Sequence, residues 1–244
     1  MKTSNLTSSS ETIGIVPSGE MNVASTGSNS LLSNVVAAHG GEAFLSIRSL
    51  TVVGTGQFFT PPQIGRLKIA LDSFTLYTAS GGRSRLEAKS VFGALVFVIR
   101  GEDKGGLVVM GGRKQELPAE HMSGLEPMEF LRMAFNNNYA VTELPENTGD
   151  SAPDNGAERC YEIRSLSGEV TCLFVDAETK LMRKLVSNRS RGEMTVSLAD
   201  YQPVAGALIP GDLRLLENGE EVFHLVGKEI TPNDVLNDKL FQTP

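Results

Sequence analysis

The second half of the chain alternates between apolar and polar positions in short segments separated by tight turns. In the segment from Glu193 to Leu198 the residues Met194, Val196 and Leu198 share one face, and the positions between them are polar. Alternation with a period of two is typical of a strand with one dry and one wet face. The pattern predicts an antiparallel meander with strands at Cys160 to Arg164, Val170 to Val175, Leu181 to Ser187, Glu193 to Tyr201, Asp212 to Leu216 and Val222 to Ile230.

The turn before the last strand predicts how that strand pairs. Asn218 and Gly219 are the residue types that adopt the two positive φ angles of a two-residue type I′ hairpin. Such a turn fixes the register of both strands that it joins. The expected pairs are Leu215 with Val222 and Leu213 with His224.

The first half begins with a strand from Arg48 to Phe59. Leu50, Val52 and Phe58 fall on one face, and Gly54 and Gly56 lie between them on that same face. Two interpretations of the glycines stay open. They mark a bulge or bend where the sheet coils, or they leave room for a ligand chain inside the sheet.

Further strands are predicted up to Met110, with polar or glycine-rich turns between them. Their expected ranges are Arg66 to Leu71, Phe74 to Ala79, Arg83 to Lys89, Gly93 to Arg100 and Leu107 to Met110. Alternation in the first of these places Leu67, Ile69 and Leu71 on the inner face. The run from Ala94 to Ile99 is apolar at every position, so we expect both of its faces to be covered.

Two helices are predicted. One runs from Leu31 to His39 and ends at Gly40-Gly41, which suits a left-handed C-cap. The other runs from Pro127 to Asn136, with Glu129 and Arg132 as its only charged residues, and a helix this apolar has to be buried. It is either a core helix that covers the outside of the apolar strand, or a plug that fills a β cavity and yields to ligand.

The inner faces of these strands and the apolar helix together predict an apolar cavity. Period-two alternation on several strands points their apolar side chains to one side of the sheet. Leu131 and Phe135 of the helix are expected to fill the cavity in part. The candidate ligand-binding residues are Leu50, Val52, Phe58, Leu67, Ile69, Phe97, Met128, Leu131, Phe135, Met194 and Val196.

The two cysteines, Cys160 and Cys172, are expected in neighbouring strands of one hairpin. A register centred on Leu166 places them directly opposite each other, and a disulfide between them is then feasible if the pair is of the closer, non-hydrogen-bonded kind. The alternative is two reduced cysteines that pack as small apolar side chains. A bridge is typical of an oxidising compartment, and reduced thiols of the cytoplasm.

Composition excludes several classes of protein. The 244 residues carry a net charge of −7 with no basic stripe, so nucleic acid is not an expected partner. No apolar run is long enough for a transmembrane helix, and the first thirty residues lack the apolar region of a signal peptide. These residues are rich in Ser, Thr, Asn and Gly and predict a disordered tail over residues 1–30. We expect one domain over residues 31–244.

Chemical motifs are sparse. The residues His39, His121 and His224 lie far apart, and the sequence contains no zinc-binding spacing, nucleophile elbow or phosphate-binding loop. We therefore expect no metal, no cofactor and no catalytic residues. The sequence favours a protein that is not an enzyme.

Three segments resemble bacterial proteins of the LolA-like family, which is similar to the outer-membrane lipoprotein carrier. They are the stretch from Val35 to Gly41 followed by Phe44 to Leu50, the hairpin from Phe174 to Leu181, and the ending from Ile230 to Pro244. The resemblance spans about residues 31 to 244. It implies a mainly β fold, an incomplete antiparallel β-barrel closed by two or three helices, whose apolar interior holds acyl chains.

The expected function follows from this resemblance and from the apolar inner faces. It is non-catalytic binding or carriage of a lipid, a lipoprotein acyl chain or another apolar ligand, in the periplasm or another extracytoplasmic space. The alternative is an interaction or sensor scaffold with a filled core that binds a protein partner. Cavity volume separates the two, because a ligand site needs about 300 to 1,000 Å³.

Overall fold

A computed structural model of the protein describes residues 25–60, 65–101, 104–117, 126–145, 158–189 and 192–242. The first helix already begins at Ser25, which is earlier than the sequence predicts. The rest of the predicted tail, residues 1–24, lies outside the described residues.

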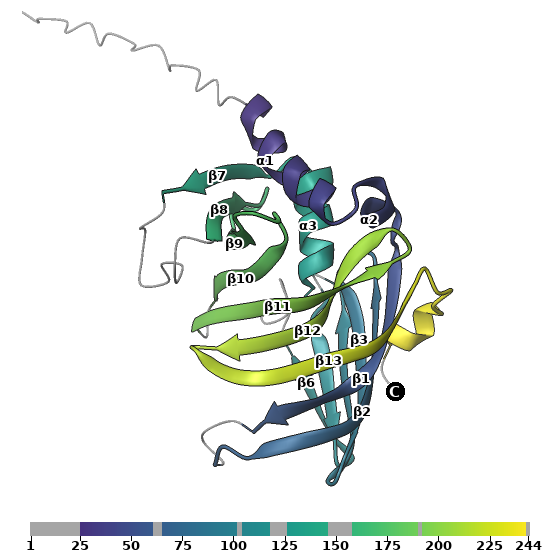
Figure 1. The fold of residues 1–244 in the computed structure, drawn as a ribbon. Coiled ribbons are helices and arrows are strands. Elements are labelled where there is room, and N and C mark those ends of the chain that lie inside the picture. Colours follow the sequence, from purple (N-terminus) through teal and green to yellow (C-terminus); the bar gives the residue numbers. More distant parts are fainter. Residues whose placement is uncertain are drawn as a thin grey trace, which may run out of the picture.

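The strands form one antiparallel sheet in the order β6-β5-β4-β3-β2-β1-β13-β12-β11-β10-β9-β8-β7. Consecutive strands pair with each other from β1 to β6 and from β7 to β13, and β1 pairs with β13 to join the two halves. The sheet curls round on itself but is not closed, because β6 and β7 are its two edges (Figure 1). The strands are β1 (Ser49–Phe59), β2 (Lys68–Ala79), β3 (Arg83–Ser90), β4 (Gly93–Arg100), β5 (Gly106–Met110), β6 (Arg113–Leu117), β7 (Ala140–Leu144), β8 (Glu158–Arg164), β9 (Val170–Asp176), β10 (Met182–Arg189), β11 (Gly192–Val204), β12 (Ala207–Glu217) and β13 (Glu220–Pro232).

This arrangement confirms the predicted fold class, an incomplete antiparallel barrel with few helices. The helical segments are α1 (Ser25–Ala38), α2 (Glu42–Ser46), α3 (Pro127–Asn136) and the short 3-10 helix η3 (Asp238–Phe241). The apolar residues of α1, α2 and α3 pack on the inner side of the sheet, where α3 lies beneath α1 (Figure 1).

Bulges at two glycines bend β1. The pairing of β1 shifts between Val53 and Gly54 on the β13 side, and between Gly54 and Gly56 on the β2 side. A Cβ atom at Gly54 would lie 2.0 Å from the carbonyl oxygen of Val226, and one at Gly56 would lie 2.4 Å from that of His224. Only glycine permits so close an approach of the backbones, so these residues let the sheet coil.

The interior contains two hydrophobic cores. The first is built on α1, α2, α3 and the inner faces of β7 to β12, with Leu32, Leu131 and Leu173 fully buried at its centre. The second lies between β1, β2, β3, β4 and β13 and contains Phe58, Phe74 and Leu225. Val52 packs against both, so the two cores meet along β1.

The outer face of β4 is covered by η3, and not by α3 as predicted. Val98 on this face is fully buried, and η3 contacts both β3 and β4. Arg83 pairs with Asp238 at 2.7 Å and stacks over the ring of Phe241. The prediction that the outer face of this strand is covered is confirmed, but the covering segment is the end of the chain. That segment has few apolar residues, so its sequence does not indicate that it packs on a strand.

The last hairpin has the predicted turn but a different register. Asn218 and Gly219 both have positive φ, 52° and 78°. A bulge between Leu215 and Leu216 displaces the pairing by one residue, so that the pairs are Leu215 with Phe223 and Leu213 with Leu225. The strands β6 and β7 were not predicted, and the two segments expected between Arg66 and Ala79 form the single bulged strand β2.

Candidate ligand groove

An apolar groove with two small cavities lies on the inner side of the sheet where the two cores meet. The first cavity, of about 60 Å³, lies between α3, α2 and strands β1, β2 and β12. The second, of about 80 Å³, lies between strands β2, β3, β4 and β11 to β13. Leu76, Leu213 and Glu126 line both, so the cavities are adjacent parts of one groove.

Most of the groove lining is apolar. The first cavity is lined by Phe44, Ile47, Leu50, Val52, Leu76, Thr78, Ala79, Glu126, Pro127, Met128, Glu129, Arg132, Ile209, Pro210 and Leu213. The second is lined by Leu76, Ser84, Leu86, Phe97, Ile99, Glu126, Val196, Leu213, Leu215, Phe223 and Leu225. The groove therefore has a polar end at α3, and its far end is apolar.

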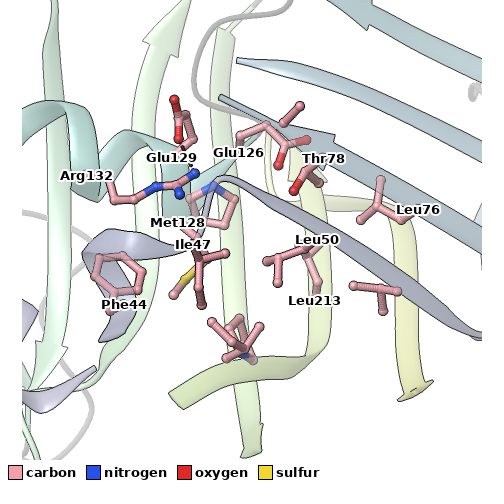
Figure 2. Close-up of a pocket in the computed structure, with 15 residues that line it drawn as sticks. Phe44, Ile47, Leu50, Leu76, Thr78, Glu126, Met128, Glu129, Arg132 and Leu213 are labelled. Atoms are coloured by element: carbon pink, nitrogen blue, oxygen red, sulfur yellow. Dashed lines mark hydrogen bonds and ion pairs between the residues drawn. The ribbon is translucent and has the colours of Figure 1, made fainter. Parts of the chain in front are cut away.

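Three side chains from the start of α3 form the polar end. Figure 2 shows Glu126, Glu129 and Arg132 on one side of the first cavity, with Leu50, Leu76 and Leu213 on the other. Glu129 and Arg132 lie three residues apart and are therefore neighbours on one face of the helix, and Glu126 is the N-cap residue directly before its first turn.

Arg132 is buried, with 8% of its surface exposed. Its Nη2 donates a hydrogen bond to the Oε2 of Glu129, while the other carboxylate oxygen of Glu129 accepts one of 2.9 Å from the backbone N–H of Gly81. Among the described residues, the Nε and Nη1 of Arg132 have no hydrogen-bond partner. The guanidinium thus brings unused N–H donors to the groove.

Glu126 stands where the two cavities join. Burial raises the pKa of its carboxyl to about 8, and the negative charge of Glu129 adds to that effect. A hydrogen bond from Ser84 and the charge of Arg132 act in the opposite direction but are weaker. At neutral pH the Glu126 carboxyl is therefore mostly protonated and uncharged.

The predicted ligand-binding residues divide into three groups. Leu50, Val52, Phe97, Met128 and Val196 line the groove. Phe58, Ile69, Leu131 and Phe135 pack into the two cores without lining the cavities, and Met194 is partly buried. Leu67, with 57% of its surface exposed, was wrongly predicted to face inward, since it lies beyond the end of the inner core and before the first residue of β2.

The glycines of β1 do not leave room for a ligand chain. The ring of Phe74 would lie 2.9 Å from a Cβ at Gly54, and the side chain of Leu225 would lie 3.1 Å from one at Gly56. Neighbouring side chains therefore fill the strip that the glycines leave. Of the two interpretations, the bulge is confirmed.

The cavities are small. Each holds only a few water-sized groups, and both volumes lie well below the 300 to 1,000 Å³ that is usual for a ligand site. In this conformation, an acyl chain fits only if side chains of the lining move. Met128, with its flexible thioether, is suited to such a movement.

The two cysteines lie on the outer face of the sheet as free, half-buried thiols. The predicted register was wrong, because Cys172 pairs with Glu162 and Cys160 with Phe174. The cysteines are thus diagonal neighbours on one face. A hydrogen bond from Cys160 lowers the pKa of Cys172, and the same contact raises the pKa of Cys160. The disulfide stays a prediction.

Glu126, Glu129 and Arg132 were not identified as site residues from the sequence. The available signal was the presence of a salt-bridging pair, three residues apart, on a helix otherwise too apolar for solvent. Such a pair usually marks the solvent side of a helix, so nothing in the local pattern indicates that it faces inward.

Within the described ranges, no group of three or more His, Cys, Asp or Glu side chains could hold a metal ion. None of the described helices has the length and hydropathy that a membrane span requires.

No family model matches the chain, and no curated protein is similar to it in sequence. Its structure is similar to that of a LolA superfamily protein from Nitrosomonas europaea, with a TM-score of 0.52 and 14% identity over 86% of this chain and 96% of the other. It is also similar to a DUF1329 family protein from Desulfovibrio piger, with a TM-score of 0.53 and 11% identity over 88% of this chain and 96% of the other. The chain therefore has the LolA-like fold predicted from its sequence.

Proposed function

We propose that the protein binds an apolar ligand, the acyl chain of a lipid or lipoprotein, in the groove between its two cores. The observation that carries this proposal is the pair of adjoining apolar cavities, which share Leu76 and Leu213. Apolar concave sites with a few polar groups are typical of ligand binding. A non-catalytic role and an extracytoplasmic location are part of the proposal, and both rest on the resemblance to LolA-like carriers.

Binding requires that the groove expands. The lining residues Leu76 and Leu213 come from two different strands, β2 and β12, and Met128 comes from α3. Rotamer changes of these side chains join the two cavities without breaking a strand pair. We therefore expect one acyl chain, not several, to enter at a time.

The proposal is tested with a fluorescent fatty acid. The wild-type protein is expected to bind the probe, and Leu213→Trp is expected to lose binding because the indole fills both cavities. Leu166→Trp is the matched control, since Leu166 is 82% exposed in the turn between β8 and β9. Leu76→Ala, which enlarges both cavities, should bind at least as well as the wild type.

Mass spectrometry of an organic extract of the protein, purified from its native source, identifies the ligand. Lipid in the extract of the wild type, and none in that of Leu213→Trp, is the expected result. Equal binding of the probe by the wild type and folded Leu213→Trp would contradict the groove as the site.

A second candidate function is a scaffold that binds a protein partner on its outer surface. The small volume of both cavities favours it, because a filled interior needs no ligand. The same measurements separate the two functions. Absence of probe binding in the wild type and in Leu76→Ala together supports the scaffold.

A further inference from the structure

We infer that the groove takes a single-chain amphiphile with an anionic head group, carboxylate or phosphate, which Arg132 binds. The inference deepens the proposed function and rests on it. It concerns the polar end of the groove, where a buried guanidinium faces an apolar cavity.

Arg132 is buried with two of its nitrogens lacking a hydrogen-bond acceptor among the described residues. Burial of a charged group is costly unless its hydrogen bonds are made, and an unmade bond to a buried charge is more costly still. Its Nε and Nη1 are buried without an acceptor among the described residues, although the side chain lines the cavity. An anion in the first cavity supplies acceptors to these nitrogens. Guanidinium groups favour carboxylate and phosphate as partners.

The carboxylate of Glu129 accepts a hydrogen bond from only one nitrogen of the Arg132 guanidinium. One of its oxygens accepts from the backbone N–H of Gly81 and the other from Nη2 of Arg132. The carboxylate is therefore held between α3 and the turn after β2. It fixes the position of Arg132 and leaves the Nε and Nη1 of that side chain without an acceptor among the described residues.

The carboxyl of Glu126 also lines the first cavity, together with Arg132. Because this group is mostly protonated at neutral pH, it adds little negative charge to repel an incoming anion. Its side chain lines both cavities, so it marks the point where a head group ends and a chain begins.

The arrangement also sets the direction of the ligand. Arg132 and Glu129 line the first cavity only, whereas Phe97 and Phe223 line only the second. The head group is thus expected at α3, and the chain passes between Leu76 and Leu213 toward the aromatic side chains. The narrow passage fits one chain.

The test uses four ligands with the same twelve-carbon chain: dodecanoate, dodecyl phosphate, dodecanol and dodecyltrimethylammonium. Binding is measured by displacement of a neutral fluorescent probe from the wild-type protein. We expect at least one anion to bind roughly tenfold or more tighter than dodecanol, as a charge-assisted hydrogen bond provides. Preference for dodecanoate indicates a free fatty acid, and preference for dodecyl phosphate a lipid phosphate.

Equal binding of the alcohol and both anions, or tighter binding of the cation, would overturn the inference while leaving the groove as an apolar site. If neither the four ligands nor the probe bind, the result contradicts the proposed function itself, binding of an apolar ligand in the groove. The ligand series alone therefore separates the two.

Variants of the arginine complete the test. Arg132→Gln is expected to remove the preference for the anion while dodecanol binding changes little, and Arg132→Lys should keep part of it. Arg214→Gln, on the outer face, is the control and should keep the wild-type preference. If Arg132→Gln does not fold, the lysine variant and the wild-type series decide the result. An unchanged preference in folded Arg132→Gln contradicts the inference.

Discussion

The carboxylate of Glu129 on α3 accepts a 2.9 Å hydrogen bond from the backbone N–H of Gly81, in the turn between β2 and β3. This contact ties the helix to the first half of the sheet, although most of α3 packs against the core of the second half. The same carboxylate binds Arg132, so one side chain holds both the helix and the buried charge in place.

Glu129→Gln is expected to destabilise the protein by about 3 kcal/mol, because it leaves the buried positive charge of Arg132 without a counter-ion. The two side chains are only 9% and 12% exposed. Glu143→Gln breaks the exposed pair with Arg159 and should change the free energy of unfolding by less than about 1 kcal/mol. Urea denaturation of both variants checks the difference, and equal effects would contradict the burial argument.

Glu126 makes stability depend on pH. Its pKa is raised from 4.5 to about 8 in the folded protein, mainly by burial, with Glu129, Ser84 and Arg132 as the other groups that act on it. Between these two values the folded state binds more protons than the unfolded state, so this carboxyl lowers stability as pH rises from 4.5 to 8. Glu126→Gln should remove that decline.

The measurement is urea unfolding of the wild type and Glu126→Gln at several pH values across this window. Ser84→Ala removes the hydrogen bond that lowers the pKa, so its decline should extend to higher pH. A decline of the same size in Glu126→Gln and the wild type would show that another group causes it.

Gly40 closes α1 against the turn between β11 and β12. Its φ is +111°, and an added Cβ would lie 2.4 Å from the carbonyl oxygen of Gly206. Gly40→Ala is therefore expected to cost about 3 kcal/mol or more, from backbone strain and the clash together. Gly41, with φ of +57°, ψ of −121° and no atom within 4 Å of an added Cβ, is the control, and Gly41→Ala should cost less, about 1 to 3 kcal/mol from backbone strain alone. Thermal unfolding that ranks the two variants the other way would contradict this placement.

Cys160 and Cys172 are expected to form an intramolecular disulfide under a mild oxidant. Their thiols are in hydrogen-bonding contact, and the lowered pKa of Cys172 increases its thiolate fraction. Because the residues are diagonal neighbours, the bridge should stabilise the protein by less than the roughly 3 kcal/mol of an unstrained loop of this length.

Thiol titration of the unfolded, unreduced protein measures the outcome. Loss of both thiols in the wild type, with one thiol retained in monomeric Cys160→Ser, is the expected result. Two thiols after oxidation would exclude the bridge.

Leu67, just before β2, and Ile69, within it, test where the buried face of this segment begins. Leu67→Ser should change stability by less than about 0.5 kcal/mol, because the side chain is 57% exposed. Ile69→Ala, at a position only 6% exposed, is expected to cost about 2 to 5 kcal/mol. Urea unfolding of both variants measures this, and similar losses would indicate that Leu67 is buried after all.

The strands and their inner faces were determined by local sequence. Alternation of apolar and polar residues predicted most strands of both halves, and Asn218-Gly219 predicted its turn, because these signals depend only on neighbouring residues. The apolar helix from Pro127 to Asn136 was predicted with the bounds that the structure has. Together with the resemblance of short segments, this was sufficient for the fold.

Registers and the polar end of the groove were decided only by the tertiary structure. A bulge shifts the pairing of β12 with β13 by one residue without a mark in the alternation, which is why the partner of Leu215 differs from the one predicted. Cys172 has a different partner because the turn between β8 and β9 is centred on Ser167, one residue later than predicted. The sequence alone predicts a solvent-facing side chain for Arg132, and only the position of α3 inside the curl of the sheet shows that it is buried. Its burial, and the donors that it offers to the groove, arise from contacts between residues far apart in the chain, and local periodicity carries no information about such contacts.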